Sequence, residues 1–146
     1  MQIFYRISSK SYPKIKIPGT SKEFCLKNFT SIFGKPTIIA DNCDDKTLGI
    51  LEDFNVTKTT LGNAKSFLFA LNKVAILPDH VIIYFVEDDY VHDSCLGLIE
   101  EGLEIADYVT LFDHPDKYQA EYKFGEDCKV MRTKSSHWKT TVSTTM

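Results

Sequence analysis

Three consecutive acids, Glu87, Asp88 and Asp89, directly follow an uninterrupted apolar segment, residues 81–86 (VIIYFV). Adjacent carboxylates repel one another, and removing even one of them from water is costly unless a positive charge pairs with it. Two interpretations stay open at this point. The acids either form the solvated polar end of a strand, or they bind a cation.

A cation bound by these acids would be a hard divalent ion. Carboxylate oxygens are preferred ligands of Mg²⁺ and Mn²⁺, and such an ion usually keeps several waters and shares its coordination with a substrate phosphate. If the strand continues through the acids, Glu87 and Asp89 point to one side of it and Asp88 to the other. One acid could then ligate the ion while another accepts hydrogen bonds from a ribose.

Two further positions carry residue types suited to ligand binding. Asp41 ends the apolar segment 36–41 (PTIIAD), where it could bind a base or a ribose, or could cap the following helix. Lys65 lies in the first turn of a helix that begins after Gly62 and Asn63. A helix N-terminus with a lysine can receive phosphate, although a capped surface helix is the simpler interpretation. The chain contains neither a P-loop nor a GxGxxG fingerprint.

The composition excludes several classes of function. With 146 residues, 43% of them hydrophobic, the chain can bury one sizeable core, and we expect a single domain over residues 1–146. The formal net charge of −3 disfavours nucleic acid as a partner. We expect no membrane span and no signal peptide. The four cysteines are widely scattered, which is typical of reduced thiols in a cytoplasmic protein.

Apolar periodicity predicts alternating strands and helices along most of the chain. Strands are expected at residues 2–8, 36–41, 55–60, 81–86 and 108–112. Helices are expected at residues 22–33, 46–54, 63–75 and 94–106. After Pro115 the pattern changes, and a hairpin around Gly125 is expected within residues 121–134.

Local signals define two of these helices and one of the strands. A polar cap at Thr20 or Ser21 begins the first helix and Gly34 ends it. The helix at 63–75 has one apolar stripe, which is the spacing of an amphipathic helix. Its members are Ala64, Phe67, Leu68, Leu71, Val74 and Ala75. Segment 81–86 shows no alternation, which indicates burial on both faces in the middle of a parallel sheet.

Alternating strands and helices predict an α/β fold: an open, mostly parallel twisted sheet with helices on both faces and a short C-terminal hairpin. Ligands of such sheets bind beyond the carboxyl ends of the strands. Three of the expected strands end with acids at that edge, namely Asp41, the triplet that begins at Glu87, and Asp113. The acids therefore lie where this class of fold binds its ligands.

The ordered set of segments resembles a GT-A-fold glycosyltransferase. The triplet Glu87-Asp88-Asp89 is similar to the EDD form of that family's DxD metal motif. Further segments resemble a glycosyltransferase-like subgroup over nearly the whole chain. They are IFYRIS, IIADNCDD, LGNAKSF, YFVEDDYVH, ADYVTLFDHPDKY and RTKSSHWKTTVSTTM.

The resemblance implies a nucleoside-diphosphate sugar as donor, Mn²⁺ or Mg²⁺ as cofactor, and a glycan, protein or lipid acceptor. It assigns Asp89 to the metal ion and Glu87 and Asp88 to the ribose. Other positions that match the donor pocket are Tyr5, Arg6, Ser8, Asp41 and Lys65. His137 and Trp138 are expected near the sugar or the acceptor.

The chain departs from the family pattern after the acidic motif. In the family, the catalytic base and a further metal ligand usually come from the half of the protein after this motif, which binds the acceptor. Here the spacing of Asp113 and Asp116 identifies neither of them as the base. The chain therefore resembles the donor-binding half of a transferase.

Three functions stay open on sequence alone. The first is a metal-dependent glycosyltransferase, complete or partial. The second is a non-catalytic module that binds a nucleotide sugar. The third is a receiver-like Mg²⁺-binding signalling domain, although the lysine that such a domain needs after its last strand is missing from YVTLFDHP. An unpaired edge strand could also join two copies of the chain.

Overall fold

The computed structural model describes residues 1–10, 17–112 and 129–140. By its internal contacts the chain divides into two compact units, Met1–Asp93 and Ser94–Met146. Each unit is described by itself below. The single domain expected over residues 1–146 stays a prediction.

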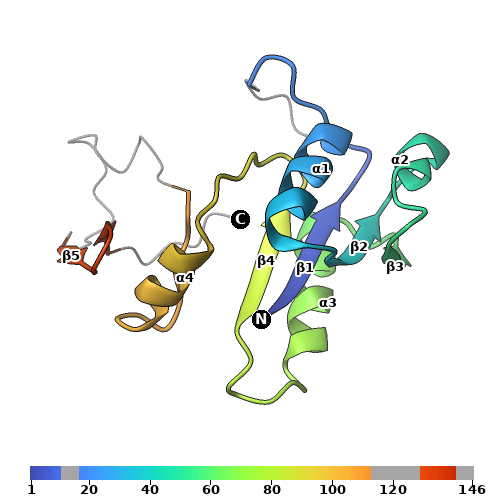
Figure 1. Ribbon diagram of the computed structural model, residues 1–146. Helices are drawn as coiled ribbons and strands as arrows, with labels where there is room; N and C mark the ends of the chain where they lie inside the picture. Colours follow the sequence, from blue (N-terminus) through green and yellow to red (C-terminus); the bar gives the residue numbers. More distant parts are fainter. Residues whose placement is uncertain (11–16, 113–128, 141–146) are drawn as a thin grey trace, which may run out of the picture. The chain divides into compact units, whose positions relative to one another are not determined.

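A four-stranded parallel sheet forms the centre of the first unit (Figure 1). Its strands are β1 (Gln2–Ile7), β2 (Thr37–Asp41), β3 (Asn55–Thr59) and β4 (Ile83–Glu87). The order across the sheet is β3-β2-β1-β4, so β1 lies between β2 and β4. In this register Arg6 is opposite Ile39 on one side and Glu87 on the other. The α/β class and the parallel sheet predicted from the sequence are confirmed.

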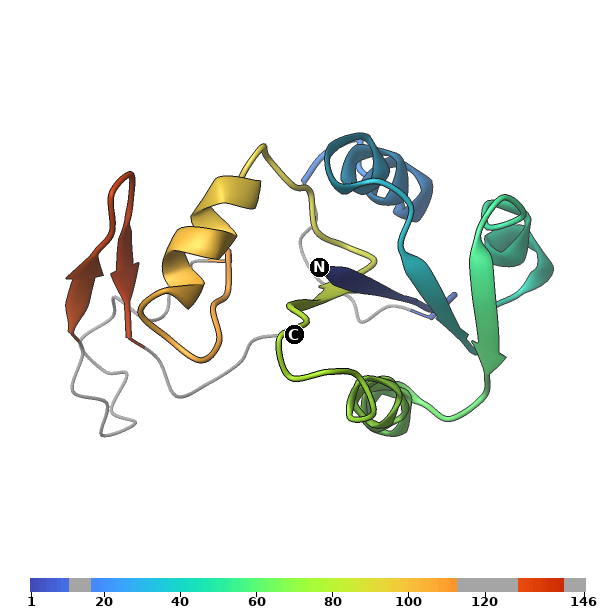
Figure 2. The same cartoon turned by 60° about the horizontal axis from the view of Figure 1, so that its bottom comes forward.

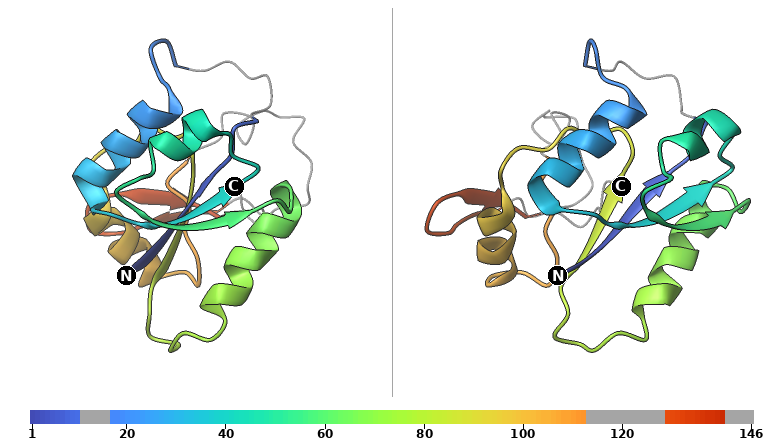
Figure 3. Two further views of the ribbon diagram at one scale, coloured as in Figure 1. Left: turned by 90° about the vertical axis from the view of Figure 1, so that its right-hand side faces the viewer. Right: turned by 45° about the vertical axis from the view of Figure 1, so that its right-hand side comes forward.

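Helices flank the sheet on its two faces (Figures 2 and 3). Helices α1 (Lys22–Phe33) and α2 (Asp45–Gly49) lie on one face, and α3 (Asn63–Val74) lies on the other. The larger core lies under α1 and α2; it contains Tyr5, Ile7, Leu26, Phe29, Ile38, Ala40, Leu51 and Val86. The smaller core lies under α3; it contains Phe4, Ile39 and Ala70. Successive residues of β1 and β2 thus contribute alternately to the two cores.

The signals at the ends of α1 act as predicted. The Ser21 side chain accepts a hydrogen bond from the backbone N–H of Phe24 at 3.1 Å. Gly34 ends the helix with a positive φ of 82° and donates its N–H to the Thr30 carbonyl at 3.0 Å. Both arrangements satisfy backbone groups that a helix terminus would otherwise leave unpaired.

Helix α3 has nearly the predicted bounds, and only part of its apolar stripe packs against the sheet. Ser66 and Ala70 are buried against the sheet, whereas Leu68, from the apolar stripe, is 55% exposed. Small side chains let the helix approach the sheet closely, and Phe67 contacts Phe85 beside them with a centroid distance of 5.5 Å. Val74 also packs on this core, so the face of α3 that meets the sheet combines small residues with part of the apolar stripe.

Strand β4 lies at an edge of the sheet within the described residues, not in its middle as predicted. Val86 is buried, while residues 81–85 are only partly buried. Side chains of this apolar segment nevertheless pack on both faces of the sheet: Tyr84 packs on Phe33 and Phe85 packs on Phe4. Two-sided aromatic packing therefore accounts for the missing alternation without a strand on each side.

The second unit contains α4 (Leu96–Leu103) and a small antiparallel hairpin of β5 (Val130–Arg132) and β6 (His137–Lys139). The strand predicted at 108–112 is wrong, because these residues form no strand; Val109 instead packs close to Gly102 of α4. The hairpin predicted around Gly125 has its centre outside the described residues. None of the helices in the described part of the chain has the length and apolar character needed to cross a bilayer.

The packing of α3 predicts that substitutions at two positions of one turn, 68 and 70, differ in their effect on stability. Ala70→Leu inserts atoms into a closed contact with the sheet, so we expect a loss of about 1–3 kcal/mol in the free energy of unfolding. Leu68→Ala removes an exposed side chain, so we expect a change within about 0.5 kcal/mol. Urea denaturation measures both values. A larger loss for Leu68→Ala than for Ala70→Leu would contradict the described packing.

Candidate functional site

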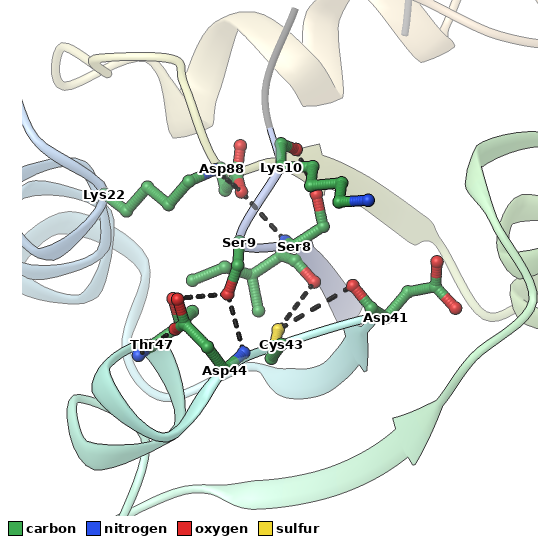
Figure 4. Close-up of polar contacts among 10 residues, drawn as sticks. Ser8, Ser9, Lys10, Lys22, Asp41, Cys43, Asp44, Thr47 and Asp88 are labelled. Atoms are coloured by element: carbon green, nitrogen blue, oxygen red, sulfur yellow. Dashed lines mark hydrogen bonds and ion pairs between the residues drawn. The ribbon is translucent and has the colours of Figure 1, made fainter.

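The carboxyl ends of β1, β2 and β4 bring the loops that follow them together at one edge of the sheet (Figure 4). The backbone N–H of Ser8, just after β1, donates to Asp88 Oδ2 at 3.0 Å. Ser9 Oγ accepts from the Asp44 N–H at 2.7 Å and lies 2.8 Å from Thr47 Oγ1. We call this region the carboxyl edge. It brings Ser8, Asp41, Glu87, Asp88 and Asp89 together, as the sequence predicts for such a fold.

The three acids at the end of β4 divide between the two faces of the sheet. Glu87 ends the strand and pairs with Arg6 on the α3 side, with 3.2 Å between Oε1 and Nη1. Asp88 forms an ion pair with Lys22 at the start of α1, and it accepts a hydrogen bond from the backbone N–H of Ser8, just after β1. Because the strand ends at Glu87, the alternation that would place Glu87 and Asp89 together does not extend to Asp89. Asp88 and Asp89 instead line one hollow.

That hollow lies at the N-terminus of α1 and has a volume of about 10 Å³. Its walls are Thr20, Ser21, Lys22, Cys25, Asp88 and Asp89. We call it the α1 hollow. The Lys22 ammonium donates to Asp88 Oδ2 within it. Two carboxylates are a fitting partial ligand set for Mg²⁺ or Mn²⁺, which commonly take one or two acids and complete their coordination with water and phosphate. No group of three or more metal-ligating side chains occurs among the described residues.

Arg6 is a buried cation at the end of β1, with 7% of the residue exposed. Besides its ion pair with Glu87, its Nη2 donates to the Asn63 carbonyl at 3.0 Å and to the Asn63 side chain. Its guanidinium carbon lies 5.3 Å from the centroid of the Phe67 ring. Arg6 therefore fixes the first turn of α3 to the edge of β1 and β4.

Asp41 is 6% exposed, and its carboxylate is enclosed by hydrogen-bond donors. Oδ1 accepts from Thr59 Oγ1 at 2.8 Å and from the Leu61 N–H at 2.6 Å. Oδ2 accepts from the Gly62 N–H at 2.9 Å and from Asn42 Nδ2 at 2.8 Å. Burial raises the pKa of this carboxyl, but the four hydrogen bonds together outweigh burial and lower it below its ordinary value. Asp41 thus secures the segment that leads into α3.

The sequence places Tyr5 in the donor pocket, and the structure places it in the core. The residue is fully buried, and its ring packs on Phe29 with a centroid distance of 5.5 Å. Among the described residues, its hydroxyl has no hydrogen-bond partner. Burial raises the pKa of this hydroxyl above its ordinary value, and the negative charge of Asp88 raises it further.

The acid Asp44 belongs to the cap of α2. Its Oδ1 accepts from the Thr47 N–H at 2.8 Å. Hydrogen bonds from the side chain and backbone of Thr47, and then from Ser9, lower the pKa of Asp44 to about 2. Asp44 is therefore ionised at neutral pH and connects the loop after β1 with the loop after β2.

The other residues singled out from the sequence are Lys65, His137 and Trp138, together with Asp113 and Asp116. Lys65 is exposed in the first turn of α3. In the second unit, His137 is exposed on β6 and Trp138 packs on α4. Trp138 Nε1 donates to Thr133 Oγ1 at 3.3 Å. The roles predicted for His137 and Trp138 near the sugar or the acceptor stay predictions. Asp113 and Asp116 lie outside the described residues.

Sequence patterns did not indicate the contacts of two further residues, Lys22 and His92. In the sequence, Lys22 has no feature beyond being the first residue of a helix. The one signal for its position at the carboxyl edge is that it directly follows the Ser21 cap of α1. His92 exchanges two backbone hydrogen bonds with the Asn28 side chain, and its Nε2 lies 2.9 Å from Tyr84 Oη. Burial lowers the pKa of His92, and a hydrogen bond to the backbone of Tyr90 acts in the opposite direction. The His92 ring packs edge-on against Phe29, Phe33 and Tyr84.

Comparison of the chain with protein-family models, with curated proteins and with solved structures gave no match.

The hydrogen bonds of Asp41 predict a pH-dependent loss of stability. Because they lower its folded pKa, their contribution is complete above the ordinary pKa of 3.8 and is lost as the pH falls through the lower folded value. In Asp41→Asn, an amide NH₂ group replaces one carboxylate oxygen and cannot accept the hydrogen bonds that this oxygen accepts. We therefore expect the free energy of unfolding at pH 7 to fall by about 1–3 kcal/mol. In urea denaturation between pH 2 and pH 7, the free energy of unfolding of the variant should fall less steeply toward low pH than that of the wild type. An exposed control, Asp53→Asn, should follow the wild type, and equal losses for both variants would contradict this role of Asp41.

The packing of Trp138 makes two glycines of α4 respond oppositely to alanine. A Cβ at Gly102 would lie 2.7 Å from Val109 Cγ1 and 2.9 Å from Trp138 Cζ2, whereas a Cβ at Gly97 would meet no atom within 4 Å. We expect Gly102→Ala to lower the stability of the second unit by about 1–3 kcal/mol and to shift the emission of the single tryptophan. Gly97→Ala should raise stability by up to about 1 kcal/mol. Unchanged fluorescence and stability in Gly102→Ala would rule out this packing.

Proposed function

We propose that residues 1–93 form the donor-binding part of a metal-dependent glycosyltransferase. In this proposal the carboxyl edge holds a nucleoside-diphosphate sugar together with Mn²⁺ or Mg²⁺. The observation that carries the proposal is the strand order β3-β2-β1-β4, with Ser8 after β1 and the acids Asp88 and Asp89 after β4.

This order supports nucleotide binding for a geometric reason. The chain proceeds from β1 outward to β3 and then returns to the other side of β1 to form β4. Loops on either side of such a reversal diverge to opposite faces, and the crevice left between them is where open α/β sheets bind ligands. Doubly wound dinucleotide-binding sheets begin with the same order. Receiver-type sheets instead place their third strand beside the first, so the pairing of β3 with β2 does not favour the signalling alternative.

The chemistry of the edge suits a diphosphate with a divalent ion. Asp88 and Asp89 would ligate the ion, which when bound would stabilise the negative charge that develops on the departing nucleoside diphosphate. Lys22 and Arg6 supply positive charge from the protein itself on the two faces of the sheet. Asp41 contributes indirectly in this proposal, because the N–H groups of Leu61 and Gly62 that donate to it belong to the segment leading into α3, which would line the base.

A non-catalytic nucleotide-sugar-binding module is the second candidate. The observation that favours it is that Arg6 pairs with Glu87 and Lys22 pairs with Asp88, so these acids already have positively charged partners within the protein. Such a module would bind the donor with the metal ion and would release no free sugar and no nucleoside diphosphate. Chromatography of the donor after incubation distinguishes it from a transferase, which slowly hydrolyses its donor when no acceptor is present.

Thermal unfolding with UDP, GDP or dTDP, each with Mn²⁺ or with EDTA, tests the proposed donor site. A ligand at a hundred times its Kd stabilises the protein by about 2.7 kcal/mol. For a chain of this length we expect a rise of about 5–10 °C in Tm for one nucleotide, and only with the metal ion.

Two variants make this measurement specific for the carboxyl edge. Asp89→Ala should abolish the metal-dependent rise in Tm. Asp79→Ala should keep it, because Asp79 is an exposed acid in the loop that enters the opposite end of β4. No rise with any nucleotide in the wild type, or an equal rise in both variants, would refute the proposed site.

A further inference from the structure

The α1 hollow contains a positive charge of the protein's own. Lys22 and Asp88 form an ion pair whose side chains are only 18% and 12% exposed, so both charges are largely removed from water. The ammonium belongs to the first residue of α1, and Asp88 follows β4, so the pair joins elements that are 66 residues apart in sequence. Asp89 lines the same hollow. Two carboxylates therefore share this hollow with one ammonium group.

A second observation concerns the hydroxyl of Tyr5. It is buried and has no hydrogen-bond partner among the residues that the structure describes, although buried hydroxyls nearly always have one. Burial raises the pKa of this hydroxyl, and the negative charges of Asp88 and Asp89, both of which line the α1 hollow, raise it further. Within the described part of the chain, the hydroxyl is thus a buried donor without an acceptor.

We propose that Lys22 is the resident counter-ion of the α1 hollow, and that a divalent cation binding to Asp88 and Asp89 displaces its ammonium from Asp88. This inference rests on the proposed function, which places the metal ion at these acids. The ammonium and the metal ion are both positive, and they repel one another when they share a carboxylate in a partly buried site. Binding of one therefore weakens binding of the other.

The exchange explains why the acids tolerate burial when no metal ion is bound. A buried carboxylate without a partner is strongly destabilising, and Lys22 supplies that partner to Asp88. Lysine suits the exchange better than arginine, because its ammonium is a compact charge on a flexible stem and makes no fixed bidentate contact. The aliphatic stem of Lys22 can therefore turn the charge out of the hollow while α1 stays in place.

Titration of Mn²⁺ into the full chain without nucleotide, followed by calorimetry or by the paramagnetic resonance of free Mn²⁺, tests this competition. Lys22→Gln removes the competing charge, so we expect about tenfold tighter Mn²⁺ binding than in the wild type. Lys27→Gln is the matched control, because Lys27 lies on the same helix and pairs with Glu23 at the surface. Lys27→Gln should bind Mn²⁺ as the wild type does.

The stability of Lys22→Gln provides a second measurement. The variant should unfold at a lower temperature than the wild type in EDTA, and Mn²⁺ should raise its Tm by more than it raises that of the wild type. If the variant fails to fold in EDTA, recovery of its circular dichroism on adding Mn²⁺ would support the exchange. Failure to recover would overturn it. Equal or weaker Mn²⁺ binding in a folded Lys22→Gln, or no Mn²⁺ binding in either protein, would also overturn it.

Failure of this inference differs from failure of the proposed function. If the wild type binds a nucleoside diphosphate only with Mn²⁺, but Lys22→Gln gains no Mn²⁺ affinity, the donor site stands and the counter-ion role of Lys22 is wrong. If Lys22→Gln gains Mn²⁺ affinity but no nucleotide binds to either protein, Lys22 is a counter-ion of a metal site that serves another ligand.

Discussion

Each buried charge at the carboxyl edge needs ion-pair or hydrogen-bond partners, and these partners determine how the elements of the first unit are arranged. Arg6, Asp41 and Asp88 are all largely buried, and a buried ion without partners would destabilise the fold by several kcal/mol. Each finds its partners on other elements. Arg6 connects β1 with β4 and α3, Asp41 connects β2 with the start of α3, and Asp88 connects β4 with β1 and α1. The polar contacts at one edge thereby fix the helices that cover both faces.

Much of the backbone could be predicted from local signals in the sequence. The cap at Ser21, the stop at Gly34 and the alternation of strands with helices predicted α1 and the parallel sheet. Local signals could not show which face of α3 packs, because apolar side chains occur on both sides of that helix and the small residues Ser66 and Ala70 give no hydrophobic signal. For the same reason the sequence could not place β4 at an edge, since aromatic packing on two faces mimics burial between strands.

The position of the acids could be predicted, but their partners could not. Parallel strands that end in acids must bring those acids to one edge, whatever the details of the loops. That Lys22 meets Asp88, and that Arg6 meets Asn63 across 57 residues of sequence, depends on where helices begin to within one residue. The separation of Glu87 from Asp88 and Asp89 likewise depends on the strand ending at Glu87, which periodicity does not determine. The carboxyl edge is therefore a network of polar contacts within the protein, and a ligand that binds there has to fit among these contacts.

Paramagnetic broadening of amide signals in ¹⁵N-labelled protein tests most directly whether the edge between β1 and β4 binds a divalent ion with a nucleoside diphosphate. With saturating nucleotide and a small fraction of Mn²⁺, we expect the amide signals of Ser8, Asp88 and Asp89 to lose intensity first. Those of Asp79 and His80, in the loop at the opposite end of β4, should keep their intensity. Uniform broadening, or the strongest broadening at Asp79 and His80, would contradict the proposed site.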